Sequence, residues 1–291
     1  MDLLSAERIF GEAARKRLVG CDGEIHDVVE STMDVARRQA VRGAPDGYAV
    51  LAERQRAGRG REGAWECPAR QGVLASIILR IGLAQDDRML TSLMGAVAAA
   101  EALQGFGVDV RIKWPNDLVV AERREGLKLR KVGGVLVEQY GEGDAAPSHI
   151  LGIGINVNQD HRNLPADTPT PATSMKVETG GRALDRNAVC VALMEKLDHW
   201  YAKLRLGQPE ALLARWRTLS CLLGERVRAR VDGRIVEGEV IGLRATGELM
   251  LRADSGEEML LTSDRATLLF RGGKSPGEGT GPTKGRCRPG P

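Results

Sequence analysis

The apolar residues of this chain follow two different patterns, and the change from one to the other falls near Ser220. Up to that point, short apolar segments typical of strands are interspersed with longer segments whose apolar residues have helical spacing. Beyond it, short segments alternate apolar and polar residues and are separated by turns that contain glycine. The first pattern predicts an α+β domain, because its strands and helices form no regular βαβ repeat. The second pattern predicts a small β-barrel domain.

The individual elements can be placed by spacing and by turn residues. Strands are predicted over 25–29, 48–53, 73–81, 110–113, 132–140, 149–157, 225–231, 234–243, 247–254 and 257–261. Helices are predicted over 3–18, 33–42, 89–106, 187–206 and 208–219. Ser31 and Thr32 stand where a helix would begin. The charged segment 121–130 is predicted to form the solvated tip of a hairpin.

These elements divide the chain into four parts. We expect an N-terminal helix within residues 1–22, a main domain over 23–220 and the barrel over 221–270. Residues 271–291 contain many glycines and prolines and almost no apolar side chains. Such a segment cannot bury enough apolar surface to fold, so we expect it to be disordered.

Composition excludes several classes of protein. The net charge of +3 is too small to predict nucleic-acid binding by itself. The five cysteines are odd in number and have no Cys-x-x-Cys spacing, so neither a zinc site nor a disulfide framework is expected. We find no secretory signal and no apolar run of about 18 residues. These features predict a cytoplasmic protein that does not enter a membrane.

A glycine- and arginine-rich stretch follows the strand predicted over 48–53. Residues 55–63 read Gln-Arg-Ala-Gly-Arg-Gly-Arg-Glu-Gly. Glycine lets the backbone turn sharply and approach a ligand, and arginine presents a planar fork of donors that suits carboxylate and phosphate. The stretch therefore predicts a loop that wraps an anion. By itself it is equally typical of a flexible solvated loop or of a nucleic-acid contact.

Three further segments place polar groups or bare backbone at predicted strands. Residues 113–117 read Lys-Trp-Pro-Asn-Asp, with a cation and two polar groups on a turn. Residues 131–138 read Lys-Val-Gly-Gly-Val-Leu-Val-Glu, and residues 152–158 read Gly-Ile-Gly-Ile-Asn-Val-Asn. Glycine inside a strand is typical of a site where a ligand lies against the backbone.

Together with Ser31, Thr32 and Gln55, these segments resemble the motifs of the biotin protein ligases, both in their residues and in their order along the chain. The resemblance extends from Ile25 to Phe270, and residues 171–175 (Pro-Ala-Thr-Ser-Met) resemble the nucleotide-side loop of that family. It implies the class II synthetase-like catalytic fold, with a mixed or antiparallel central sheet, flanking helices and a C-terminal SH3-like β-barrel. One departure is that Trp65 follows Ala64 directly, so the loop is one residue shorter than the family pattern.

The resemblance also implies a reaction. Biotin would react with ATP, accompanied by Mg²⁺, to give biotinyl-5′-AMP and pyrophosphate. A lysine of a biotin carboxyl carrier domain, such as that of acetyl-CoA carboxylase, would then attack the activated carbonyl. Because one anion attacks another in the first step, preorganised cations would lower the barrier. The resemblance assigns this catalytic role to Arg61, Lys131 and Lys113.

The resemblance assigns the remaining site residues by ligand. Biotin contacts are implied for Ser31, Thr32, Gln55, Arg59, Gly60, Arg61, Lys131 and Gly134. ATP contacts are implied for Arg59, Arg61, Trp65, Asn116, Asp117, Lys131 and Asn156, and no residue is assigned to a metal. Simpler roles stay open. Ser31 would also serve as a helix cap, Asn156 as the end of a strand, and Glu138 as an ion-pair partner.

Two other functions have to be weighed. A lipoate or octanoate ligase or transferase would share a related catalytic fold, but the transferases need an activated cysteine, and neither Cys67 nor Cys190 has such a setting. A nucleic-acid binder would use the glycine-arginine stretch, but aromatics make up only 3% of the chain, and stacking platforms need them.

Two expectations concern regulation and motion. Too few residues precede Ile25 for a helix-turn-helix module, so we expect a ligase without DNA binding, either a monomer or a homodimer. We also expect the loop over 58–65 to be mobile when empty and to become ordered when ligands bind, because ordering glycine is costly and anion contacts offset that cost.

Overall fold

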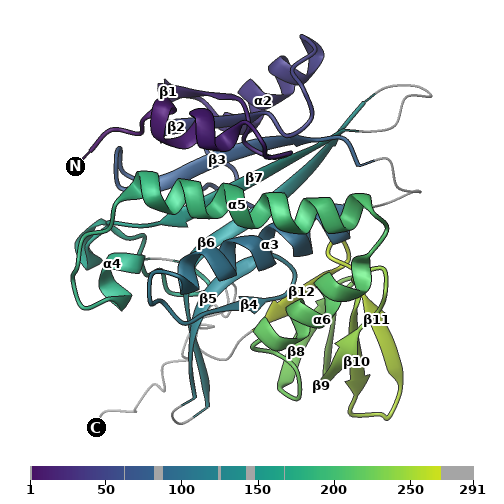
Figure 1. Cartoon of the computed structure of the whole chain (residues 1–291). Coiled ribbons are helices and arrows are strands. Elements are labelled where there is room, and N and C mark those ends of the chain that lie inside the picture. The colour runs from purple at the N-terminus through teal and green to yellow at the C-terminus, as the bar shows by residue number, and fades with distance from the viewer. Residues whose placement is uncertain are drawn as a thin grey trace, which may run out of the picture.

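The computed structural model describes residues 2–61, 63–81, 88–123, 126–141, 148–166 and 168–269 (Figure 1). Its centre is a seven-stranded sheet with the strand order β1-β2-β3-β7-β6-β5-β4. The edge strand β1 pairs with β2 in parallel, whereas the other neighbours pair antiparallel. The expected mixed central sheet of an α+β fold is therefore confirmed.

Most elements of the main domain agree with the sequence pattern, but the strand over 117–123 and the short helix over 175–178 were not predicted. Its strands are β1 (Gly23–Val29), β2 (Ala49–Gln55), β3 (Gly72–Leu79), β4 (Val110–Lys113), β5 (Asp117–Arg123), β6 (Leu127–Tyr140) and β7 (Ser148–Asn156). Its helices are α1 (Ala6–Phe10), α2 (Thr32–Val41), α3 (Arg88–Gln104), α4 (Met175–Glu178), α5 (Arg186–Arg205) and α6 (Pro209–Leu219), with 3-10 turns η1 (Glu12–Ala14) and η2 (His161–Asn163).

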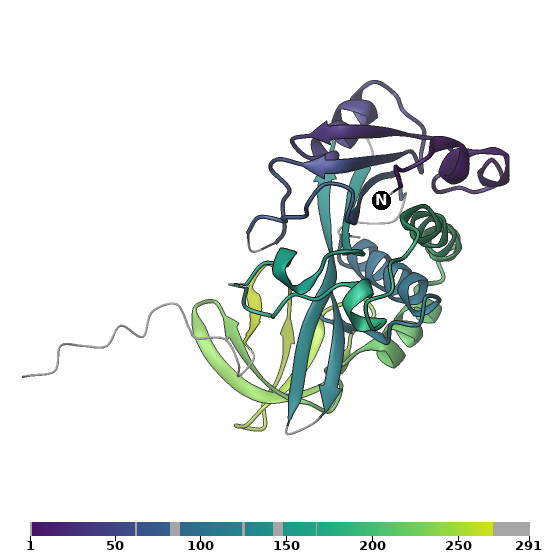
Figure 2. The same cartoon turned by 90° about the vertical axis from the view of Figure 1, so that its left-hand side faces the viewer.

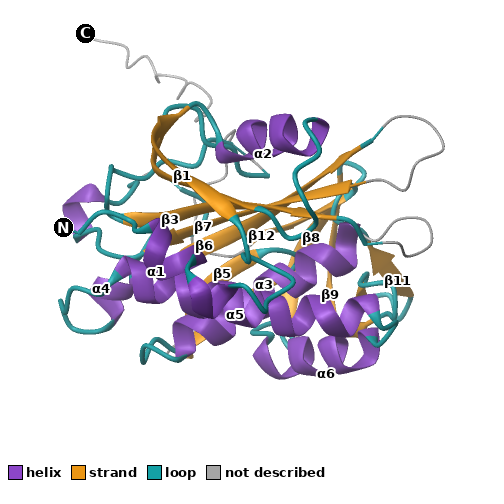
Figure 3. Cartoon of the chain, turned by 45° about the horizontal axis from the view of Figure 1, so that its top comes forward, coloured by secondary structure: helices purple, strands orange, loops and turns teal. Residues whose placement is uncertain are grey.

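The helices cover both faces of the central sheet. Figure 3 shows α2 on one face and α3, α5 and α6 on the other. Because side chains alternate along a strand, Val50 and Ile78 pack against Met33 of α2, whereas the next residue in β2, Leu51, belongs to the larger core on the other side. The face under α2 holds the smaller apolar cluster, which leaves room for polar side chains at the start of that helix.

The helix expected over 3–18 is wrong. Only α1 and η1 form there, and the backbone between them is extended at Gly11. A Cβ atom at Gly11 would lie 2.1 Å from the carbonyl oxygen of Glu7. The backbone ahead of α1 is bound by distant side chains, since the Leu4 N–H donates to Glu53 and the Ser5 N–H donates to Asn187, each at 2.7 Å. These tertiary contacts take the place of helical hydrogen bonds.

The charged segment 121–130 forms a hairpin, but its strands are longer than expected. Strand β5 reaches Arg123 and β6 begins at Leu127, and only the tip lies between them. Residues 124 and 125 lie outside the described residues. Apolar and charged side chains alternate along residues 127–130 of β6, which is the signal of a half-exposed strand.

The C-terminal part is a second, antiparallel sheet with the order β11-β10-β9-β8-β12. Its strands are β8 (Arg226–Val231), β9 (Arg234–Leu243), β10 (Leu249–Ala253), β11 (Glu258–Leu261) and β12 (Ala266–Leu269). Strand β12 was not predicted. In the part of the chain that the structure describes, the pairings leave β11 and β12 as edges, so a closed barrel is not seen. The tail expected to be disordered, 271–291, lies outside the described residues.

The two sheets are joined beside β4. The N–H of Cys221 donates to the carbonyl of Ile112 at 3.1 Å, and the indole N–H of Trp114 donates to the carbonyl of Gly247 at 3.2 Å. Figures 1 and 2 show the C-terminal sheet (yellow-green) at the end of the molecule opposite β1 and α2. None of the helices described has the length and apolar character needed to cross a membrane. The boundaries proposed for the four parts of the chain stay a prediction.

Candidate functional site

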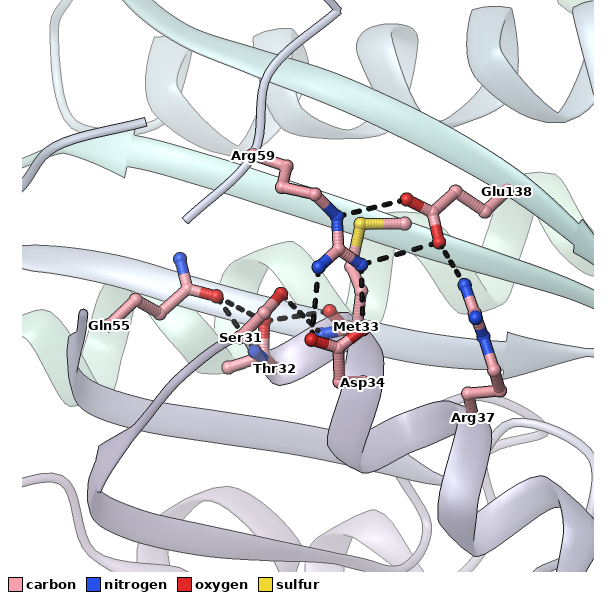
Figure 4. A network of polar contacts seen from close by, with 9 residues as sticks. Ser31, Thr32, Met33, Asp34, Arg37, Gln55, Arg59 and Glu138 are labelled. Carbon is pink, nitrogen blue, oxygen red and sulfur yellow. Dashed lines mark hydrogen bonds and ion pairs between the residues drawn. The ribbon is translucent and has the colours of Figure 1, made fainter. Parts of the chain in front are cut away.

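The start of α2 gathers the hydroxyl and amide groups that the sequence predicted for biotin (Figure 4). The hydroxyl of Ser31 accepts from the N–H of Met33 at 3.3 Å and caps the helix. Gln55, at the end of β2, accepts from the N–H of Thr32 at 2.7 Å and from its hydroxyl at 3.0 Å. Ser31, Thr32 and Gln55 are therefore brought together. The predicted cap role of Ser31 is confirmed, and its contact with biotin stays a prediction.

Ser76 extends this cluster and was missed by the sequence analysis. Its hydroxyl lies 2.8 Å from that of Thr32, and both side chains are buried. A polar residue within the otherwise apolar strand Gly72–Leu79 was the available signal. A buried hydroxyl needs a hydrogen-bond partner, so Ser76 fixes the orientation of Thr32.

The glycine-arginine stretch forms a tight hairpin in this structure. The Gly60 N–H donates to the Gly63 carbonyl at 2.7 Å, and the Trp65 N–H donates to the Gly58 carbonyl at 2.9 Å. A Cβ atom at Gly58 would lie 2.4 Å from the carbonyl oxygen of Trp65, so this close approach requires glycine. Residue 62 lies outside the described residues. The predicted mobility of the loop remains a prediction.

The contacts of Arg59 that the structure describes are with carboxylates of α2 and β6. It donates two hydrogen bonds to the carboxylate of Asp34, at 2.8 and 3.0 Å, and one from Nε to Glu138 at 3.2 Å. The hydrogen bonds from Arg59 lower the pKa of Asp34, and the same contacts raise the pKa of Arg59. The ion-pair role considered for Glu138 is confirmed. The contacts of Arg59 with biotin and ATP stay predictions.

Lys113 and Lys131 converge on the carboxylate of Asp117. The Lys131 Nζ lies 2.5 Å from one carboxylate oxygen of Asp117, and the Lys113 Nζ lies 3.5 Å from the other. Lys113 also donates to the hydroxyl of Thr170 at 3.3 Å. Burial would raise the pKa of Asp117, but the charges of Lys131, Lys113 and Arg61 together lower it. The structure therefore brings two of the four predicted cations onto one carboxylate, and the charge of a third, Arg61, also acts on it.

Arg61 also connects the loop to the C-terminal sheet. Its Nη1 donates to the carbonyl of Ser263 at 3.1 Å, in the connection between β11 and β12. This contact could not be predicted from the sequence, because Ser263 lies in a connection of the other sheet, far from the loop along the chain. Arg61 is thus placed between the lysine cluster and the C-terminal sheet.

Backbone pairing holds Lys131 in place. Its N–H donates to the carbonyl of Pro171 at 2.7 Å, and its carbonyl accepts from Thr173 at 2.8 Å. The segment predicted as a nucleotide-side loop thus runs beside β6. Gly134 leaves room for the lysine, because a Cβ atom there would lie 3.3 Å from its Cε. The backbone of Lys131 is therefore held by the segment 171–173 that runs beside it.

Trp65 lies against β7 beside Lys131. A Cβ atom at Gly154 would lie 2.4 Å from the indole ring, so the ring rests on bare backbone. The Lys131 Nζ is 5.8 Å from the centre of the ring, within the range of a cation–π contact. Within the described part of the chain, the buried indole N–H of Trp65 finds no hydrogen-bond partner. Its predicted contact with ATP remains a prediction.

The two predicted asparagines already have partners within the protein. The amide of Asn116 donates to the carbonyl of Val135 at 2.5 Å. The amide of Asn156 donates to the carbonyl of Thr173 at 3.0 Å, and its oxygen accepts from Gln159 at 2.9 Å. Both side chains tie a strand end to its surroundings, as expected for a structural asparagine. Their contacts with ATP stay predictions.

The cysteines and acidic residues described here argue against a nucleophilic thiol and against a metal site built from protein side chains. Burial raises the pKa of Cys67, Cys190 and Cys221 to about 12, so these thiols stay protonated at neutral pH. Among the described residues, no group of three or more His, Cys, Asp or Glu side chains could hold a metal ion. The polar chemistry of this region therefore depends on the lysines, arginines and hydroxyls.

Two family models match separate parts of this chain. Residues 25–158 match the biotin/lipoate A/B protein ligase family, and residues 222–264 match the biotin protein ligase C-terminal domain. The biotin–[acetyl-CoA-carboxylase] ligase of Mycobacterium tuberculosis is 32% identical over 223 residues, which cover 71% of this chain and 75% of that protein. The bifunctional ligase/repressor BirA of Bacillus subtilis is 30% identical over 241 residues, covering 82% of this chain and 72% of BirA.

A solved structure agrees with the sequence comparison. The biotin protein ligase of Aquifex aeolicus in complex with biotin and ATP superposes with a TM-score of 0.71 and is 25% identical. The match covers 85% of this chain and 98% of that one. The chain belongs to the biotin protein ligase family.

Proposed function

We propose that this protein is a biotin–protein ligase, which activates biotin with ATP and transfers the biotinyl group to a lysine of a carrier domain. The observation that carries the proposal is the convergence of two lysine side chains on the carboxylate of Asp117. Two ammonium groups share this single carboxylate, and the charge of Arg61 acts on it as well. A site built in this way favours a bound anion.

The first step brings two anions together. A carboxylate oxygen of biotin attacks the α-phosphorus of ATP, the bond from that phosphorus to the β-phosphate bridging oxygen breaks, and pyrophosphate leaves. Negative charge develops on the α-phosphate oxygens in the transition state. Lys131 and Lys113 are held by Asp117 before the substrates arrive, so little reorganisation is needed when the charge develops.

The second step makes an amide bond. The neutral amine of the carrier lysine attacks the carbonyl carbon of biotinyl-5′-AMP, the carbon–oxygen bond to the phosphate breaks, and AMP leaves with the electron pair. The attacking nitrogen loses a proton to water as the amide forms. Lys131 stabilises the negative charge that builds on the carbonyl oxygen.

Biotin and its adenylate would extend between the two clusters already described. The hydroxyl and amide groups of Ser31, Thr32 and Gln55 suit the polar ureido ring of biotin, and the lysines suit its carboxylate. Mg²⁺ would enter bound to the phosphates of ATP. Asp117 is already paired with two ammonium groups, so it does not fit as a magnesium ligand, and we assign no protein residue to the ion.

The partner is the carrier domain of a biotin enzyme. Relatives in Mycobacterium tuberculosis and Paracoccus denitrificans are named biotin–[acetyl-CoA-carboxylase] ligases, and they support acetyl-CoA carboxylase as the enzyme that supplies the carrier. The alternative of a lipoate or octanoate ligase or transferase is not favoured. Such a transferase forms a thioester on a cysteine, and burial raises the pKa of Cys67 and Cys190 to about 12.

The proposal is tested with purified protein, biotin, ATP and Mg²⁺. We expect release of pyrophosphate and accumulation of biotinyl-5′-AMP, followed by biotinylation when a carrier domain is added. Octanoate and lipoate in place of biotin serve as competing substrates. Failure to form any adenylate, or faster activation of lipoate than of biotin, would overturn the proposal.

A further inference from the structure

Arg59 lies between carboxylates that come from two different elements of the fold. Asp34 is in the first turn of α2 and accepts the bidentate pair of hydrogen bonds described above. Glu138 is on β6, where one carboxylate oxygen accepts from Arg59 and the other accepts from Arg37 at 2.6 Å. Figure 4 shows the four side chains joined in one network. We call Asp34, Arg37, Arg59 and Glu138 the clamp.

The geometry of the clamp distinguishes it from an ordinary surface ion pair. A single exposed pair contributes little, whereas a bidentate arginine in a network holds its position better. The side chain of Arg59 is 36% exposed and that of Glu138 is 26% exposed, so both are partly shielded from water. Two arginines and two carboxylates also balance in charge. An incoming phosphate would have to displace a carboxylate to reach Arg59.

The position of the clamp links the loop to both parts of the site. Asp34 follows the hydroxyl cluster at the start of α2 by two residues, and Glu138 lies on the same strand as Lys131. Arg59 itself pairs with Ala64 across the hairpin of residues 58–65. Holding Arg59 therefore fixes the base of the hairpin, while Arg61 lies two residues further along.

We propose that Asp34 and Glu138 are positioning residues of the ligase, which hold Arg59 as the anchor of the 58–65 loop and so direct Arg61 toward the lysine cluster. This inference rests on the proposed function. It changes the role of Arg59 from a direct ligand of the anion to a fixed point of the loop. Arg61, Lys113 and Lys131 are then the cations that meet the adenylate.

Loss of this anchor should reduce the retention of the biotinyl-5′-AMP intermediate more than it weakens the binding of biotin. With the clamp intact, the loop stays near the site and retains biotinyl-5′-AMP until the carrier lysine attacks. Without it, the loop is held away from the site for a larger fraction of the time, and the adenylate escapes into solution. The KM for biotin then stays close to that of the wild type, while carrier biotinylation per adenylate formed falls.

The test compares variants of the full-length protein. Asp34→Asn and Glu138→Gln are made singly and together, and Arg59→Gln is made alone and combined with both. Amide hydrogen exchange of residues 58–65 is measured without ligand, and release of labelled biotinyl-5′-AMP is measured after its formation. We expect both rates to rise about fivefold in the double variant, equivalent to about 1 kcal/mol. Arg59→Gln should give the same result, with no further rise in the triple variant.

Matched variants separate positioning from a general loss of structure. Asp254→Asn removes a carboxylate that pairs with Arg226 on the C-terminal sheet, far from the loop in sequence, and should leave both rates unchanged. Asp34→Glu keeps the charge and should restore much of the retention. Exchange of the amides in α2 shows separately whether Asp34→Asn loosens the helix, since an acidic residue also stabilises its first turn.

Several results would overturn the inference. Unchanged exchange in the double variant would show that the clamp does not hold the loop, whatever the activity. Faster exchange without faster release of the adenylate would show that the anchor has no role in the reaction. Tighter retention would show that the carboxylates compete with the ligand, and a much larger effect of Arg59→Gln than of the double variant would show direct anion binding. If the wild type forms no adenylate, the proposed function fails. The exchange measurement still tests whether the clamp holds the loop in place.

Discussion

Two carboxylates on the central sheet, Glu53 and Asp117, both pair with cations that are partly or fully buried. They differ in the number of cations that each one meets. Among the described residues, Glu53 on β2 meets one cation, Arg186, at 2.7 Å, and the exposed fractions of these side chains are 4% and 2%. Asp117 on β5 meets two cations, Lys113 and Lys131. Glu53 and Arg186 balance each other in charge, whereas in the contacts described here two ammonium groups share the single carboxylate of Asp117.

The hydrogen bonds reinforce this difference. Glu53 also accepts from the N–H of Leu4, and Arg186 donates to the carbonyls of Gly72 and Asp2. The pair is thus closed by backbone groups and ties the N-terminal segment to the sheet. At Asp117 the side chains of the lysines are 11% and 30% exposed, so they remain within reach of a ligand. A balanced, closed pair is typical of structure, and an unbalanced, partly open one is typical of function.

The largest expected effect is on the balanced pair. Arg186→Met removes the cation and leaves the carboxylate of Glu53 buried without its partner, which should lower the free energy of unfolding by about 3–5 kcal/mol. Adenylate formation per folded molecule should stay near the wild-type rate. Urea unfolding together with pyrophosphate release measures the two quantities. A loss of activity without a loss of stability would contradict the structural role.

The next effect is expected at the unbalanced group. Lys131→Gln removes a preorganised positive charge from the reacting centre and should slow adenylate formation by about 10²–10³-fold. Stability should change little, because Lys113 remains to pair with Asp117. Lys128→Gln, on the exposed part of the same strand, is the matched control and should keep full activity. Equal rates in the two variants would remove Lys131 from the mechanism.

Much of the fold could be predicted from the sequence, because buried apolar residues recur with the spacing of a helix or of a strand. The pattern failed where partners distant in sequence decide the conformation. Residues 3–18 have helical spacing, yet Glu53 and Asn187 capture the backbone ahead of α1. The outer end of strand β5 was missed because Glu122 and Arg123 belong to the charged segment that was interpreted as a solvated connection.

The site could be predicted only as far as motifs specify it. The segment 113–117 and the segment beginning at Lys131 were expected to supply cations to one anion, and the structure brings them together. The partners of Arg59 could not be predicted, because Asp34 lies 25 residues before it and Glu138 lies 79 residues after it. Only the packing of α2 and β6 around the loop makes them neighbours.

A third variant tests the unbalanced group from the side of the carboxylate. Asp117→Asn leaves two ammonium groups close together without a negative charge between them, so their repulsion is no longer offset. We expect the free energy of unfolding at pH 7 to fall by about 2 kcal/mol. Added pyrophosphate should restore part of this stability, because an anion replaces the missing charge. Asp109→Asn, on an exposed residue, is the control for loss of one carboxylate.

The smallest expected effect is on the pH dependence of stability. It tests whether the lysines around Asp117 stabilise its charged form. The pKa of Asp117 is lowered in the folded protein, so this carboxylate contributes stability above its unfolded pKa, which is lost as the pH falls through the folded value. The wild type should therefore lose stability more steeply below about pH 4 than Asp117→Asn does, by less than the difference at pH 7. Denaturant unfolding at pH 7, 5, 4 and 3 gives both curves. Parallel curves would show that the lysines do not stabilise the charged form of Asp117, and the comparison with Glu53 would then lose its basis.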